Sequence, residues 1–328
     1  MTKPNPKDSA TGIALILLTL LGWSSVPLFL KHFTGSLDAW TTNGWRYGMS
    51  ALFWAPYLIY ATHKGRVPRK LWLAALAPAC FNIPAQVAFA WAPYYINPGM
   101  LAFMLRLQIV FVAFATYALF PTERPILRSP TYIGGVIVVF GGMVGLLFLG
   151  SAPPRGDNAK GIALGIAAGI LYGAYSIAVR KFITGMSAVL AFAAISLYTA
   201  MGLIPVMLLV GKNRGVMAWT LSWGQFGLLF ASAMAGIALT HVTYYAAIAR
   251  IGLAMSVGVI LLQPFLASAG SYFLFDERLT IPQWISGIVA MLGAAVMVRT
   301  QWTRAPSPDH VAAQPKPLRD VSNPALTR

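Results

Sequence analysis

Ten runs of about 20 predominantly apolar residues follow one another along this 328-residue chain. A helix of that length crosses the hydrocarbon core of a bilayer. It also pairs its backbone N–H and C=O groups within itself, which is necessary because lipid tails offer no hydrogen-bond partners. Only 10% of the residues are charged, whereas about a quarter is usual in soluble domains. We therefore predict an all-α polytopic membrane protein with ten transmembrane helices. The predicted spans are residues 11–33, 39–62, 70–92, 98–119, 130–150, 159–182, 187–211, 224–249, 251–275 and 281–299.

The positive charges predict how the chain is oriented. If the amino terminus is inside, sixteen of the 24 Lys and Arg residues lie on the cytoplasmic side, six lie outside, and Arg46 and Arg106 fall within spans. This bias predicts an inner (plasma) membrane protein with both termini in the cytoplasm. Residues 1–10 and 304–328 are the expected tails, and the second is predicted to be disordered because of its Pro-rich polar composition. The net charge of +16 thus indicates a lipid bilayer as partner, and no nucleic acid is expected.

An internal repeat divides the chain into halves. The tetrapeptide GIAL at residues 12–15 recurs at residues 161–164, and the same offset pairs Lys31 with Arg180. The two halves, residues 11–150 and 159–299, each contain five predicted spans. An odd number of spans makes the halves enter the membrane from opposite sides, so we expect two inverted five-helix repeats around a central cavity, an architecture typical of secondary transporters.

Several segments resemble one known family. The closing stretch LLQPFLASAGSYFLFDERLTIPQWISGIVAMLGAAVMV (residues 261–298), the Gly22-Trp23 pair followed by Lys31, and the Arg46-Tyr47 pair are similar to the EamA family of the drug/metabolite transporter superfamily. The resemblance implies a ten-helix bundle with a central cavity that moves small metabolites, often amino acids or related compounds, outward. The first-half counterpart of the closing stretch differs, since it carries Arg106 in mid-span and Pro121 in its acidic turn.

Two arginines are the strongest candidates for a substrate site. Ionisable residues within spans are costly and often functional, and no Asp or Glu of this chain falls within a predicted span. Arg46 and Arg106 therefore have no buried carboxylate partner. They either offer their planar guanidinium groups to a substrate carboxylate or phosphate, or bond backbone carbonyls and snorkel outward.

Other polar and aromatic residues near mid-span extend this candidate site. Some share a helix face by i+3 or i+4 spacing, and others are repeat partners. The amides bind substrate or hold helices together, and the aromatic rings line a cavity or pack a core. His241, one turn before Tyr244 and Tyr245, is a candidate protonation site or a donor to a neighbouring helix. The predicted substrate-binding residues are Trp23, Asn43, Arg46, Tyr47, Asn82, Gln86, Arg106, Gln108, Tyr172, Tyr175, His241 and Gln263.

Local signals predict two further features of the helices. Gly161, Gly165, Gly169 and Gly173 form a stripe on one helix face, which predicts close approach of a neighbouring helix. Asp38 and Ser187 are expected to be amino-terminal helix caps.

The sequence lacks the patterns of enzymes and pumps. It has one cysteine, Cys80, no Cys/His cluster and no phosphate-binding Gly-x4-Gly-Lys-Ser/Thr loop, so we expect no metal, no cofactor, no enzymatic activity and no ATP-driven pumping. The prediction is a secondary transporter for a small carboxylate-bearing metabolite, driven by a proton or substrate gradient. The alternatives are a transporter of nucleotide-linked or lipid-linked metabolites and a non-transporting membrane scaffold.

Overall fold

The computed structural model describes residues 6–149, 156–183 and 185–304, and every regular element within them is helical. The first half contains α1 (Pro6–Phe33), α2 (Ala39–His63), α3 (Lys70–Trp91), η1 (Ala92–Tyr94), α4 (Pro98–Met104), η2 (Leu105–Leu107), α5 (Gln108–Leu119), η3 (Pro121–Glu123), α6 (Arg124–Leu127) and α7 (Pro130–Phe148). The second contains α8 (Gly156–Phe182), α9 (Ala188–Val210), η4 (Lys212–Thr220), α10 (Trp223–Ala233), η5 (Met234–Ala238), α11 (Thr240–Ile251), α12 (Leu253–Ile260), α13 (Gln263–Phe275) and α14 (Ile281–Arg304).

The predicted all-α polytopic membrane fold is confirmed. Nine helical segments of the described chain are long and apolar enough to cross a membrane, and they coincide with nine of the ten predicted spans. The tenth is α2, which is 25 residues long but less apolar, because residues 41–50 carry several buried polar side chains. The predicted span that is not apolar enough by this measure is therefore the one that carries the predicted polar face.

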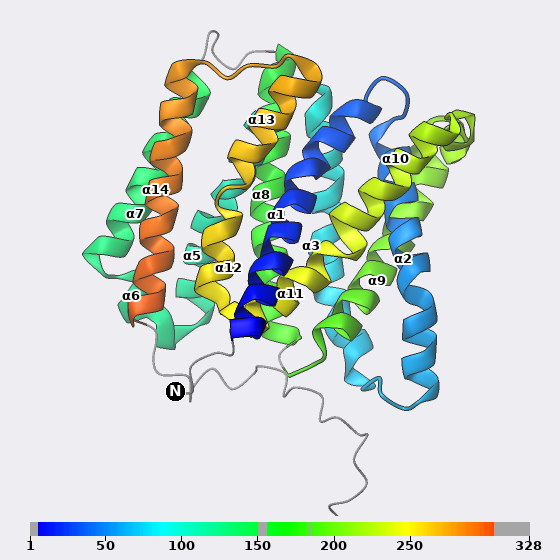
Figure 1. The fold of residues 1–328 in the computed structure, drawn as a ribbon, viewed down its shortest axis with the longest axis horizontal. Helices are drawn as coiled ribbons and strands as arrows, with labels where there is room; N and C mark the ends of the chain where they lie inside the picture. Colours follow the sequence, from blue (N-terminus) through cyan, green and yellow to red (C-terminus); the bar gives the residue numbers. More distant parts are fainter. Residues whose placement is uncertain (1–5, 150–155, 184, 305–328) are drawn as a thin grey trace, which may run out of the picture.

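The two halves run in opposite directions. Figure 1 shows α1 starting at the lower end of the bundle, where α14 ends, whereas α8 starts at the upper end. The pairing of helices follows this inversion. The first helix of each half packs on the third span of the other half, α1 on α11 and α8 on α3, and α2, α4 and α7 pack on α9, α13 and α14. The two inverted repeats therefore pack against each other along several of their helices and form one bundle.

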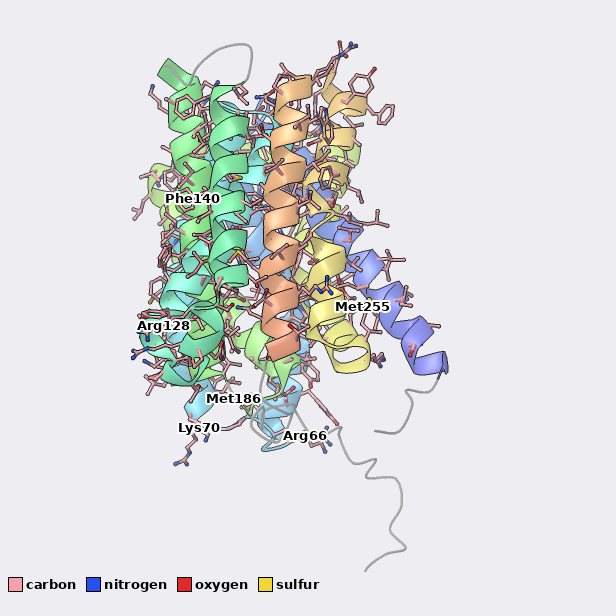
Figure 2. All side chains as sticks on the ribbon, turned by 90° about the vertical axis from the view of Figure 1, so that its left-hand side faces the viewer. Arg66, Lys70, Arg128, Phe140, Met186 and Met255 are labelled. Carbon is pink, nitrogen blue, oxygen red and sulfur yellow. The ribbon has the colours of Figure 1, made fainter. Side chains whose placement is uncertain are left out.

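The outer surface of the bundle fits a membrane environment. Large apolar side chains are strongly exposed there, among them Leu73, Leu209 and Phe273, as lipid contact requires. Figure 2 shows Phe140 pointing outward from α7, while Arg66 and Arg128 lie toward the end of the bundle where α1 begins.

Three predicted spans are interrupted in the structure, which the apolar patterns did not reveal. Span four changes to a 3-10 turn at η2, span eight contains the π-helical turn η5, and span nine breaks between α12 and α13. The last break precedes Pro264, which lacks a backbone N–H and lies in the first turn of α13, where that N–H would have no partner within the helix. Such interruptions are accepted within a membrane where the freed backbone groups face protein or a polar interior.

The helix ends differ from prediction at several points. Helix α1 begins at Pro6, so part of the predicted tail 1–10 is helical, and α14 continues to Arg304. The remainder of the tail 304–328 lies outside the described residues. Asp38 caps α2 as predicted, since its Oδ1 accepts from the Thr41 N–H at 3.0 Å. The Ser187 prediction is wrong, because its side chain makes no capping hydrogen bond to α9.

Glycine allows the closest helix contacts. The predicted close approach at the α8 stripe is confirmed, and the neighbouring helix is span four: a Cβ at Gly165 would lie 3.0 Å from Met104 Cβ, and one at Gly173 would lie 2.6 Å from Phe111 Cδ1. Helices α7 and α14 meet in the same way, since a Cβ at Gly142 would lie 2.5 Å from the Ala290 backbone N. Its neighbour Gly141 faces open space.

These two adjacent glycines give a matched test of the α7–α14 contact. We expect Gly142→Ala to lower the apparent melting temperature in detergent, because backbone atoms must move and overpacking costs about 1–3 kcal/mol. Gly141→Ala should leave the melting temperature unchanged or raise it, since alanine favours helix. Equal losses in the two variants would contradict the close approach.

Candidate functional site

All twelve predicted site residues avoid the outer surface of the bundle. Six are buried: Asn43, Arg46, Tyr47, Asn82, Gln86 and Gln263. Six are partly accessible: Trp23, Arg106, Gln108, Tyr172, Tyr175 and His241. They come from both halves of the chain, on α1, α2, α3, η2, α5, α8, α11 and α13. The inverted fold therefore gathers residues that lie up to 240 positions apart in the sequence, as the Gln263–Trp23 contact illustrates.

Arg46 is the most deeply buried charge of the site. Its side chain is 1% exposed, and its Nε and Nη1 groups have no hydrogen-bond partner. Within the described residues it takes part in no ion pair. A charge in this state is expensive unless something anionic compensates it. The guanidinium lies beside η5, where a Cβ at Gly236 would come within 3.0 Å of Arg46 Nη2.

An amide network fixes the α2 face against α3. Asn82 Nδ2 donates to Tyr47 Oη at 3.1 Å and to Thr199 Oγ1 at 3.0 Å. Asn43 Nδ2 donates to the Gln86 backbone carbonyl at 2.7 Å, while Asn43 Oδ1 stays unpaired. The Gln86 side chain also bonds the Tyr47 side chain. The predicted face of α2 thus points inward, and its polar groups are held in place by neighbouring helices.

Arg106 lies at the break of span four and reaches the break of span nine. Its Nη2 donates to Gln263 Oε1, and Gln263 Nε2 donates in turn to the Trp23 backbone carbonyl at 3.0 Å. Arg106 Nε is buried without a partner. Both functional groups of the Gln263 amide are therefore occupied within the protein, and Gln263 orients Arg106. Gln108, its repeat partner, makes one side-chain bond, to Ser176 Oγ at 3.2 Å.

Aromatic rings form one continuous set of contacts in the site, called here the aromatic wall. Trp23 packs on His241 and Tyr244 with ring centroids 5.4 and 5.0 Å apart, and His241 stacks on Phe192 at 4.4 Å. Tyr175 bonds Tyr245 across the bundle. The His241 Nδ1 lies 3.0 Å from the Ile237 carbonyl, which the π-helical turn leaves available.

The structure adds residues that the sequence did not indicate. Phe192 on α9 was not predicted, because one phenylalanine in an apolar helix carries no distinguishing pattern. Gly236 was not predicted either, because no local residue type marks a π-helical turn. The spacing of Tyr244 and Tyr245 after His241 was the available signal for the remainder of this wall.

The partly accessible residues of the site come from both halves of the bundle. Trp23, Arg106, Tyr172, Tyr175 and His241 are each only partly exposed. We call the region that these five side chains border the chamber. Guanidinium and amide donors on one side and aromatic faces on the other suit a small molecule with an anionic group and an apolar body. Within the described residues, no cluster of His, Cys, Asp or Glu could hold a metal ion.

Two other hollows, of about 370 and 360 Å³, lie away from the chamber. One is an apolar groove between α2, α3 and α9, and the other lies beside the turn between α13 and α14. Neither is lined by a predicted site residue.

Inverted halves that meet around a polar interior are an arrangement found in many membrane transporters. A family model described as the EamA-like transporter family matches residues 10–148 and again residues 159–299. The chain therefore belongs to the EamA-like transporter family, whose members are membrane transporters and not enzymes.

Comparison with solved structures supports the same fold. Matches extend to 26 solved chains, and one of them, described as "Crystal structure of protein", is 17% identical and superposes with a TM-score of 0.61 over 90% of this chain and 99% of that chain. No curated protein sequence matches the chain.

The two repeat-related glutamines can be separated by mutation. Gln263→Ala leaves two partly buried groups unpaired, Arg106 Nη2 and the Trp23 carbonyl, and an unpaired group costs about 1–3 kcal/mol when it is buried. Gln108→Ala removes one bond from a partly accessible amide and costs about 0.5–1.5 kcal/mol. We expect Gln263→Ala to lower the melting temperature in detergent distinctly more than Gln108→Ala. Equal shifts would contradict the positioning role of Gln263.

Proposed function

We propose that this chain is a secondary transporter that exports a small carboxylate-bearing metabolite, such as an amino acid or a related compound. The observation that carries the proposal is Arg46, a guanidinium that is 1% exposed and has two unpaired N–H groups. A carboxylate is a suitable partner for an arginine, because the planar guanidinium group offers several N–H donors to its oxygens and carries the opposite charge.

Electrostatics favours an anionic group over a neutral one. The spans of the described chain contain Arg46 and Arg106 but no Asp or Glu, so the chamber has an excess of positive charge. Attraction between opposite charges is stronger in a low-dielectric interior than in water. A bound carboxylate would supply the charge and the acceptors that Arg46 lacks, so binding energy is concentrated on this residue.

The aromatic wall supports an apolar or aromatic body on the cargo. Trp23, Tyr244 and His241 form a continuous set of ring contacts, and ring faces pack well on flat or apolar groups.

The driving force is proposed to be a gradient of the substrate itself. Proton-coupled carriers commonly use membrane carboxylates as relays, and this chain has none within its spans. His241 remains the candidate for proton coupling. If it carries the proton, His241→Gln abolishes the pH dependence of transport; if that dependence persists, coupling through His241 is excluded.

The orientation proposed from the sequence completes the hypothesis. The proposed location is the inner membrane, with both termini in the cytoplasm. The reason is that the end of the bundle where α1 begins carries the larger share of Lys and Arg. Export then moves cargo from the α1-start end to the opposite end.

Substitution of Arg46 tests the proposal. In proteoliposomes that exchange labelled external against unlabelled internal L-amino acids, we expect Arg46→Gln to reduce counterflow at least tenfold. That factor corresponds to the loss of one hydrogen bond to a charged group, about 1.5–3 kcal/mol. Arg46→Lys keeps the charge but not the two parallel donors, and should give an intermediate loss.

Arg66→Gln is the matched control, because Arg66 is an exposed loop cation whose guanidinium lies 5.9 Å from the Tyr60 ring centroid. It should exchange at the unmodified rate. Absence of exchange by the unmodified protein for every amino acid and carboxylate tried would overturn the substrate class. Full exchange by Arg46→Gln would overturn the site.

A further inference from the structure

Two ion pairs connect the halves of the bundle, and they are repeat partners of each other. Lys31 at the end of α1 corresponds to Arg180 at the end of α8. Glu123, in the sequence LFPTER, corresponds to Glu277 in LFDER. In the structure Lys31 pairs with Glu277 and Arg180 pairs with Glu123. Each cation thus pairs with the acid of the opposite half.

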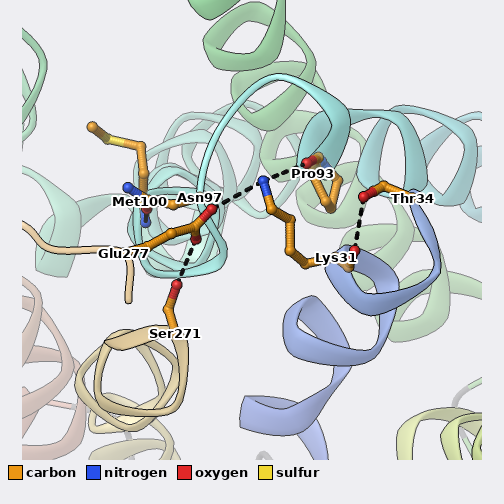
Figure 3. A network of polar contacts seen from close by, with 7 residues as sticks. All are labelled: Lys31, Thr34, Pro93, Asn97, Met100, Ser271 and Glu277. Atoms are coloured by element: carbon orange, nitrogen blue, oxygen red, sulfur yellow. Dashed lines mark hydrogen bonds and ion pairs between the residues drawn. The ribbon is translucent and has the colours of Figure 1, made fainter. Parts of the chain in front are cut away.

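The Lys31–Glu277 pair is embedded in further contacts. Lys31 Nζ lies 3.0 Å from Glu277 Oε1 and donates to the Pro93 carbonyl at 3.3 Å (Figure 3). Glu277 Oε2 accepts from Ser271 Oγ at 2.7 Å. The two side chains are 25% and 23% exposed. This pair joins α1 to the turn between α13 and α14, at the end of the bundle where α8 begins.

The Arg180–Glu123 pair occupies the opposite end. It joins α8 to η3, the short turn after α5. The Arg180 guanidinium also lies over the Phe120 ring, 4.2 Å from its centroid. Its side chain is 47% exposed, compared with 25% for Lys31, so this pair is the wetter of the two.

We propose that these ion pairs are the two gate latches of the transporter, one closing each mouth of the chamber. Each latch joins the two halves at one end, so moving the halves apart at that end must break it while the other latch holds. Because the repeats are inverted, the same device serves both ends. The structure, with both pairs formed, is a state closed at both mouths.

The strength of such pairs suits a gate. Partly exposed ion pairs stabilise a conformation only modestly, which corresponds to a population change of about two- to fivefold. A latch of this strength opens readily during transport, yet its loss changes how often a mouth is open.

A third ion pair provides a control within the same turn. Arg278 and Asp276 lie 3.1 Å apart, are 68% and 80% exposed, and belong to one half. The hydrogen bond to Asp276 and its negative charge raise the pKa of Arg278. This pair does not connect the two halves, so its loss should not change how often either mouth is open.

Thiol labelling of a chamber residue tests the latches without requiring a known cargo. Cys80 is the one cysteine of the chain, so Cys80→Ala with Ser176→Cys gives a single reporter on the chamber side of α8. A membrane-impermeant maleimide is applied to intact cells and to inside-out vesicles, and labelling rates are compared.

We expect opposite shifts from the two latches. Glu277→Gln should raise labelling from the Lys31 side about two- to fivefold and lower it from the other side. Glu123→Gln should do the reverse, Asp276→Asn should change neither, and Lys31→Glu with Glu277→Lys should restore the original ratio. Shifts in the same direction, or none, would overturn the proposal.

A covalent version covers the case in which a charge variant fails to fold. Cysteines in place of Lys31 and Glu277, joined by a bifunctional thiol reagent, should block labelling from that side only, and cysteines in place of Arg180 and Glu123 should block the other. A labelling rate that is unchanged by the cross-link would contradict the proposed latch. The labelling experiment needs no cargo, so it tests the latches independently of the carboxylate hypothesis. Failure of that hypothesis is detected by the exchange assay instead.

Discussion

A guanidinium without an anionic partner in the middle of a membrane protein is the constraint on which the arrangement of this bundle depends. Hydrocarbon offers no acceptor for it, so Arg46 must face the protein interior. The remainder of α2 follows, with polar residues inward and a lower apolarity than the other spans. The π-helical turn at Gly236 gives the side chain its space, and the Asn82 amide fixes its neighbour Tyr47.

The frame of the protein is nearly symmetric, whereas its interior is not. Helix pairs repeat across the two halves, and so do the ion pairs of Lys31 and Arg180. Both interior arginines come from the first half, and at the corresponding positions of the second half stand Ile195 and Leu261. A symmetric frame can open equally to either side, while an asymmetric interior recognises one orientation of a cargo. The asymmetric placement of the arginines therefore relates to which cargo is recognised. The symmetry of the helix pairs relates to how the bundle opens.

Predictions that depend on a single helix were more accurate than predictions that depend on contacts between distant segments of the chain. Apolar run length located the spans, and i+4 spacing identified the inward face of α2, because both depend on one helix and its solvent. The Ser187 cap prediction was wrong, since capping depends on a side-chain rotamer and not on residue type alone. The roles of Gln108 and Gln263 could not be separated, because they occupy equivalent positions and differ only in which neighbours the fold brings to them.

By itself, the amino-acid order determined the helical class, the repeat with its partner residues Lys31 and Arg180, and the two candidate arginines, since each rests on composition, periodicity or internal similarity. Only the tertiary structure decided that spans four, eight and nine are interrupted, that Arg106 reaches Gln263, and that cations of one half meet acids of the other. The physical reason is that freed carbonyls, amides and charges are stable in a membrane only when a distant segment satisfies them. Local sequence does not specify which segment that will be.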